Sequence, residues 1–146
     1  MTGESPAVEA LRHAIESFLD QSQLKYSALD DGWIRLLFGE IGSLSAVWLL
    51  PQAWEPDYTI VHVESIVRSG VRTGPELDVY LSDENSKTLF GKLVVDEATG
   101  EVRFTQPLLG NFLNRTELEK AIGIAGATAN TYGSVLAERF GGTSPA

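Results

Sequence analysis

Cysteine is absent from this chain of 146 residues. Its absence excludes disulfides, thiolate metal sites and thiol catalysis. Histidine is scarce as well, because His13 and His62 are the only two in the chain. Neither has a second histidine or a carboxylate at a metal-ligand spacing, so we predict that both are structural residues and that the protein holds no metal and no cofactor.

Basic residues are also few. The chain has 11 lysines and arginines and 20 acidic residues, which gives a net charge of -9. Such a surface repels phosphate backbones, and we predict no nucleic-acid partner. No apolar run approaches the roughly 18 residues of a membrane span. The segment from Met1 to Pro6 carries neither a basic nor an apolar signal region. We therefore expect a bacterial-type cytoplasmic protein that does not bind membranes.

Catalytic motifs are missing too. The chain has no Gly-x-Ser-x-Gly elbow, and the glycine-containing stretch 39–43 lacks a phosphate-binding pattern and a helix to follow it. The paired acids Asp30–Asp31 and Asp83–Glu84 are explained by a turn and a helix exit. We predict no catalytic residues and no enzyme activity. A small-molecule enzyme, the alternative, would require a deep pocket with convergent polar groups and shifted pKa values.

What the chain does contain is enough apolar material for one core. Hydrophobic residues make up 43% of it, and its length suits one domain better than two. We predict a single α+β domain spanning residues 1–146, with residues 1–4 and 141–146 as flexible tails.

Two helices are predicted at the ends of this domain. Ser5-Pro6 is a suitable helix entry, and apolar residues then recur at spacings of three and four over 8–19. Asn114 with Glu117 three positions later predicts a capped start for the last helix. Leu113 and Leu118 flank this cap at the spacing of a hydrophobic staple.

Strands fill the region between the helices. We predict strands at 24–29 and 33–38 joined by a two-residue type I′ turn at Asp30-Asp31-Gly32, then 44–50 ended by Pro51, 58–67, and a hairpin of 90–95 with 101–105. A short helix is favoured from Pro75 to Asn85, with Thr73 and Glu76 as a capping box, although alternating apolar residues leave a strand as the alternative there. Strands in runs with flanking helices predict an antiparallel sheet with helices on one face.

The last helix carries an unusual lane of small residues beside its core stripe: Gly123, Gly126, Ala127, Asn130, Gly133 and Ala137. Three glycines inside a helix cost about 3 kcal/mol relative to alanine. Close approach of another backbone would offset this cost. The lane then packs tightly against the first helix or the sheet, or it contacts a second subunit or a partner helix.

Aromatic residues gather in the first half of the sheet. Trp33, Arg35 and Leu37 share a face opposite the inward set. Trp48 follows on the next predicted strand, and Trp54 lies in the predicted loop at 54–57. If helices cover one face only, these residues form an exposed patch of the kind that binds proteins or peptides. The alternative is a second small core beneath the Trp54 loop.

The segments 74–85 and 89–96, the turn to 101–104 and the capped helix from Leu113 to Tyr132 together resemble the YbjN family and its relatives with the type III secretion chaperone-like fold. The resemblance implies a curved antiparallel sheet with a helix at each end, often paired as a dimer, that binds segments of other proteins. It also implies that the segment after Pro75 is helical. It carries over no catalytic residues.

Two functional hypotheses follow. In the first, the protein is a non-enzymatic chaperone-like module whose apolar sheet face, with Trp33, Arg35, Leu37, Trp48 and Trp54, receives a protein or peptide client. The second is a regulator or immunity-type inhibitor that binds one dedicated folded protein. Gly123, Gly126, Asn130 and Gly133 are the predicted oligomer or helix-packing residues, and a homodimer is the predicted assembly.

Overall fold

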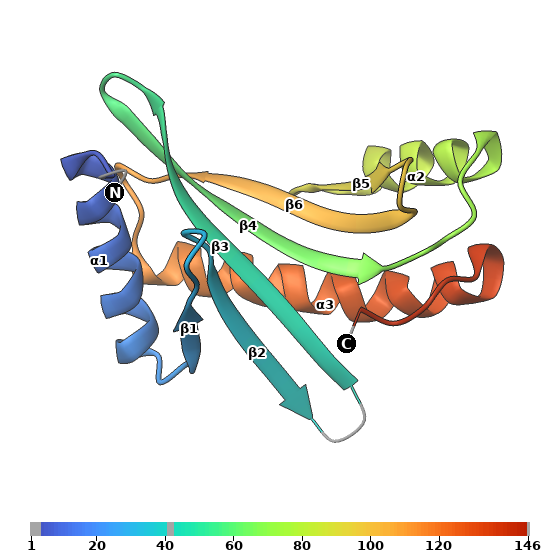
Figure 1. Cartoon of the computed structure of the whole chain (residues 1–146), viewed down its shortest axis with the longest axis horizontal. Helices are drawn as coiled ribbons and strands as arrows, with labels where there is room; N and C mark the ends of the chain where they lie inside the picture. Colours follow the sequence, from blue (N-terminus) through green and yellow to red (C-terminus); the bar gives the residue numbers. More distant parts are fainter. Residues whose placement is uncertain (1–3, 41–42, 146) are drawn as a thin grey trace.

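The computed structural model describes residues 4–40 and 43–145, and the side chains of residues 37–45 fall outside that description. Six antiparallel strands form one sheet in the order β1-β2-β3-β4-β6-β5 (Figure 1). The elements in chain order are α1 (Pro6–Gln21), β1 (Tyr26–Ala28), β2 (Ile34–Glu40), β3 (Ser43–Glu55), β4 (Tyr58–Arg68), α2 (Pro75–Lys87), β5 (Lys92–Asp96), β6 (Glu101–Leu109) and α3 (Arg115–Phe140). The predicted α+β class and element order are confirmed.

Helices α1 and α3 cover one face of the sheet, as predicted (Figure 1). Alternate residues of β4 point toward them, so Thr59, Val61, Val63, Ser65 and Val67 are all buried. A single core cluster joins these strands to the apolar stripes of both helices. The opposite face of the sheet is free of α1 and α3, and it is called the open face below.

Both terminal helices begin where their caps predict. The Oγ atom of Ser5 accepts a hydrogen bond from the backbone N–H of Val8 at 3.3 Å. Asn114 Oδ1 accepts from the backbone N–H of Glu117 at 2.9 Å. Each cap satisfies a backbone donor that the first helical turn leaves without a partner. The sheet therefore receives its two covering helices at fixed points of the chain.

The turn between β1 and β2 differs from the prediction. A type I′ turn needs positive φ at both central residues, but only Gly32 has it here, at 92°. The backbone N–H of Leu29 bonds to the carbonyl of Trp33, which leaves three residues in the loop. Glycine adopts positive φ at no steric cost, unlike any residue with a Cβ atom, and the three-residue loop confines this conformation to Gly32.

Strand β3 also runs further than predicted, because Pro51 lies within it instead of ending it. The pairing of β2 with β3 stops at Ile34 opposite Leu49. Beyond that point, the described strands give β3 a neighbour on the β4 side only, where Pro51 lies opposite Val61. A proline is tolerated in a strand where its missing N–H faces no partner.

Helix α2 confirms the helical interpretation of residues 75–85. Its N-cap is Gly74, with φ at 142° and no side-chain cap, so the predicted capping box of Thr73 with Glu76 is wrong. Pro75 occupies the first helical position, where a missing N–H costs nothing. The cap therefore falls on the residue directly before the proline, one position later than the threonine.

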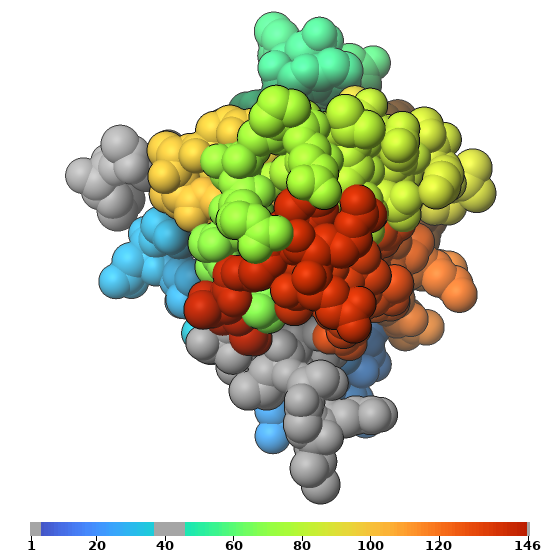
Figure 2. Space-filling view, turned by 90° about the vertical axis from the view of Figure 1, so that its right-hand side faces the viewer, coloured from blue at the N-terminus to red at the C-terminus, as the bar shows by residue number. Residues whose placement is uncertain are grey.

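Two polar contacts fix α2 in place. Asn85 Nδ2 donates to the backbone carbonyl of Leu93 at 2.9 Å, and the N–H of Leu93 donates to Asn85 Oδ1 at 2.7 Å. The preceding residue of α2 contacts α3, because Tyr132 Oη donates to Glu84 Oε1 at 3.0 Å, where α2 and the end of α3 pack side by side (Figure 2). Burial and the hydrogen bond to Glu84 raise the pKa of Tyr132 to about 12. Helix α2 thus lies along the outer edge of β5.

The predicted tail at 141–146 makes backbone contacts in its described part. Thr143 and Ser69 exchange two backbone hydrogen bonds, at 3.0 and 2.7 Å. Arg68 adds side-chain hydrogen bonds to the carbonyls of Gly141 and Gly142. These contacts hold the chain after α3 against the end of β4.

Candidate partner-binding face

The open face is built by one row of neighbouring residues across the sheet. Strand register places Arg35 of β2 beside Trp48 of β3, Trp48 beside Glu64 of β4, and Glu64 beside Thr105 of β6. These positions alternate with the buried ones that face α1 and α3. The face is more polar than the sequence analysis suggested, because β4 and β6 contribute charged and hydroxyl groups to it.

The sheet splits next to this row. The described pairing of β3 with β4 starts at Trp48 opposite Glu64 and runs toward the Ala53 end of β3. On the other side of Glu64, β4 continues through Ser65 and Ile66 in pairing with β6 alone. The two strands diverge there (Figure 1). Among the described residues, the edge of β4 that faces β3 consequently has no strand neighbour between Glu64 and the end of the strand at Arg68.

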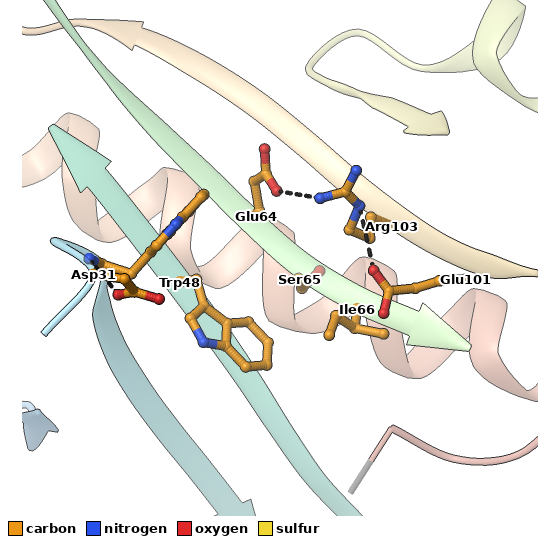
Figure 3. Close-up of a pocket in the computed structure, with 8 residues that line it drawn as sticks. Asp31, Trp48, Glu64, Ser65, Ile66, Glu101 and Arg103 are labelled. Atoms are coloured by element: carbon orange, nitrogen blue, oxygen red, sulfur yellow. Dashed lines mark hydrogen bonds and ion pairs between the residues drawn. The ribbon is translucent and has the colours of Figure 1, made fainter. Parts of the chain in front are cut away.

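A hollow of about 230 Å³ lies at this split, on the open face. Figure 3 shows its lining, in which the ring of Trp48 stands on the β3 side and the side chains of Glu64 and Arg103 point toward each other on the β4 and β6 side. The eight lining residues are Asp31, Trp33, Trp48, Glu64, Ser65, Ile66, Glu101 and Arg103.

Ion pairs fix the charged wall of the hollow. Arg103 Nη1 lies 3.4 Å from Glu64 Oε1, and Arg103 Nε lies 3.5 Å from Glu101 Oε1 (Figure 3). The second contact lacks hydrogen-bond geometry and counts as a charge contact only. Thr105 Oγ1 donates to Glu64 Oε2 at 3.2 Å. The carboxylate of Glu64 is thus held at both oxygens, and 18% of its side chain is exposed.

Two of the five predicted binding residues line this hollow, and a third lies beside it. Trp33 and Trp48 line it, and both are half-buried. Arg35 is exposed and lies over the ring of Trp48, with its guanidinium carbon 5.8 Å from the ring centroid. The indoles are therefore neither enclosed in a second core nor fully in solvent. Each presents part of its surface to the open face.

The other two predicted residues are not brought to the hollow in the described structure. The backbone of Leu37 pairs with Ala46, and its side chain lies outside the described part of the chain. Trp54 is 58% exposed and lies at the far end of β3, where its ring is 6.1 Å from that of Tyr58. It lies six positions along β3 from Trp48, a distance of about 20 Å.

Sequence reasoning missed the charged members of the site: Asp31, Glu64, Glu101 and Arg103. Alternation along β4 does place Glu64 opposite the buried valines, so its face could have been predicted. That β6 pairs with β4 could not be read from the chain, because β5 precedes β6 and forms its other neighbour. Without that strand order, nothing brings Arg103 to Glu64.

The predicted helix-packing residues divide between two sides of α3. Gly126 is buried, and a Cβ atom added to Gly133 would lie 3.3 Å from the backbone carbonyl of Val67 on β4. Gly123 is exposed, with no atom within 4 Å of an added Cβ, and Asn130 is also exposed. Gly126 and Gly133 thus face the protein interior, whereas Gly123 and Asn130 lie on the outer surface of the helix.

Metal ligands do not gather anywhere among the described residues, since no group of three or more histidine, aspartate or glutamate side chains could hold an ion. His62 lies on the open face with its Nε2 atom 2.8 Å from Gln52 Oε1.

Within the same described ranges, no helix has the length and apolar character needed to cross a membrane.

Comparison with known proteins decides the family. Residues 7–146 match the family model described as T3SS (YopN, CesT) and YbjN peptide-binding chaperone 1. The chain belongs to this family. Its members are described as peptide-binding chaperones, which indicates a binding protein and not an enzyme.

The fold of this family member is similar to that of a solved structure described as "Structure of the HopA1-SchA Chaperone-Effector Complex". The TM-score is 0.61 at 11% sequence identity, and the match covers 93% of this chain and 99% of that chain. No curated protein matches the chain. The resemblance to secretion chaperones that the sequence indicated is therefore confirmed at the level of family and fold.

Proposed function

We propose that this protein holds an extended segment of a partner protein on its open face, across the split between β3 and β4. The observation that carries the proposal is the hollow itself, where two half-buried indoles stand beside a strand edge without a neighbour. Trp33, Arg35 and Trp48 are the proposed contact residues from the β2 and β3 side.

Two features of this site suit an extended peptide. A strand edge offers backbone donors and acceptors that a peptide in extended conformation can use, and alternate peptide side chains then fall into pockets on one face. Indole rings supply large apolar contact area at a low cost in conformational entropy. The edge of β4 beyond Glu64 provides the first feature, and Trp33 with Trp48 provides the second.

The test is a selection of random 12-residue peptides displayed on phage against the immobilised full chain. Enriched peptides are synthesised with a fluorescent label and titrated against the wild type, Trp48→Ala and Trp33→Ala. Truncating an aromatic anchor in a contact of this kind costs about 2 kcal/mol, which is a loss of roughly thirtyfold in affinity. The matched control is Phe112→Ala, which removes an aromatic side chain that is 71% exposed in the connection between β6 and α3.

Peptides that bind all of these variants equally would place the contact elsewhere and refute the proposal. Failure to enrich any peptide would favour the second hypothesis, an inhibitor of one folded protein. Limited proteolysis of a partner captured from lysate separates the two, because a bound folded partner resists cleavage and a bound extended segment does not.

A homodimeric state and a bacterial cytoplasmic setting remain predictions. Light scattering of the purified chain tests the first, with an expected mass of twice 15.9 kDa. Fractionation of the producing cell tests the second.

A further inference from the structure

We infer that the hollow at the split of the sheet recognises one basic side chain, arginine or lysine, in the segment that the open face holds. This inference rests on the proposed function and specifies the chemistry of the partner. It concerns a single anchor residue, not the overall charge of the client.

The charges around the hollow are unbalanced. Three carboxylates line it, those of Asp31, Glu64 and Glu101, against the one guanidinium of Arg103. Arg103 already contacts two of them, Glu64 and Glu101. The lining itself therefore carries two more negative than positive charges, three carboxylates against one guanidinium. The guanidinium of Arg35, which lies 5.8 Å from the centroid of the Trp48 ring, offsets one of these charges beside the hollow and leaves one uncompensated. The carboxylate of Asp31 comes from the opposite wall to the other two (Figure 3).

The carboxylate of Glu64 keeps room for a further donor. One of its oxygens faces Arg103 and the other accepts from Thr105. A carboxylate has about four lone-pair positions, so these contacts leave some of them available. A guanidinium or ammonium group of a partner can donate there without displacing either protein contact. An incoming carboxylate would instead meet uncompensated negative charge.

The aromatic wall favours the same partner chemistry. Trp rings attract cations through their negative faces, and Arg is the commonest partner. The chain itself already shows this preference, since the guanidinium of Arg35 lies over the Trp48 ring. The hollow combines this ring and that of Trp33 with the carboxylates across from them. Apolar rings would hold the stem of an arginine or lysine while the carboxylates hold its head.

The experiment uses a peptide from the selection described above that requires Trp48, with each basic residue replaced in turn by citrulline or norleucine. Citrulline keeps the shape of arginine and removes its charge. A charge-assisted hydrogen bond contributes about 1.5–3 kcal/mol, so one replacement should weaken binding at least tenfold. Replacement of the other basic residues should change affinity less.

A protein variant locates the effect. Glu64→Gln keeps an acceptor for Thr105 and removes the charge, and the penalty for the critical citrulline should shrink by roughly threefold. Glu138→Gln, exposed on α3, changes net charge by the same amount and should leave the penalty unchanged.

The outcomes separate the two proposals. Peptides that require Trp48 but tolerate every citrulline and norleucine would overturn the basic anchor and leave the binding face in place. An equal effect of Glu64→Gln and Glu138→Gln would show long-range attraction only and would also overturn the anchor. Peptides indifferent to Trp48 would refute the proposed face, and the anchor with it.

Discussion

Asn85 offers a sharp test of how this fold is held together. Its side-chain amide makes two hydrogen bonds with the backbone of Leu93, at 2.9 and 2.7 Å, on the outer edge of β5. Replacement by alanine removes both and leaves a partly buried donor and acceptor without their protein partner. Each such bond contributes about 1 kcal/mol. The Asn85→Ala variant should therefore lose about 2 kcal/mol of unfolding free energy.

Urea denaturation followed by tryptophan fluorescence measures this loss. With a slope of about 2 kcal/mol per molar urea, the midpoint should fall by about 1 M. Ser82→Ala, at an exposed position of the same helix, is the control and should stay within about 0.5 kcal/mol of the wild type. Hydrogen exchange adds a local measurement, because the N–H of Leu93 should exchange faster in Asn85→Ala only.

Equal midpoints for the two variants would refute the reasoning. They would mean that water replaces the asparagine amide at Leu93 without loss, and that α2 is held by its apolar residues alone. A lower midpoint with unchanged exchange at Leu93 would also contradict it, because the destabilisation would then arise elsewhere in the helix.

The remaining predictions concern α3 and the reach of the open face. Gly123→Ala should raise the unfolding free energy by about 1 kcal/mol, because an added Cβ meets open space. Gly126→Leu overfills a buried position and should lower the unfolding free energy by about 1–3 kcal/mol. The mass of the Gly126→Leu protein in solution should stay unchanged. The pKa of Tyr132 is about 12 in the folded protein and about 10 in the unfolded chain, so the unfolded chain loses the phenol proton first as pH rises. The unfolding free energy should therefore fall between pH 10 and 12. Urea titrations of Tyr132→Phe should show a smaller fall. Trp54→Ala should weaken the binding of only those peptides that extend about six residues along β3 from Trp48. Titration of truncated peptides checks this.

Local chemistry explains what the sequence could predict. Asn114 and Ser5 specify helix starts through side-chain caps, and the alternation of β4 identifies its buried face before any contact is known. These features depend on residues within a few positions of each other. The start of α2 is predictable for the same reason, since Pro75 occupies its first helical position.

Errors arose where the outcome depends on a neighbouring strand. A proline predicts the end of a strand, but whether Pro51 fits within β3 depends on which side of the strand is occupied, and β2 stops before it. The charged wall of the hollow was missed in the same way, because Arg103 reaches Glu64 only through the pairing of β6 with β4. The tryptophans were identified individually, yet only strand register shows that Trp54 lies apart from the others.

The contact of Asn85 with β5 has a consequence for self-association. A sheet with two accessible rims can stack copy upon copy into an open-ended fibre. Here a second copy of the chain could pair with the edge of β5 only after the hydrogen bonds between Asn85 of α2 and Leu93 are broken. Growth by edge-to-edge pairing of sheets would thus end after one step, so the unpaired edge of β4 at the split does not by itself lead to a fibre.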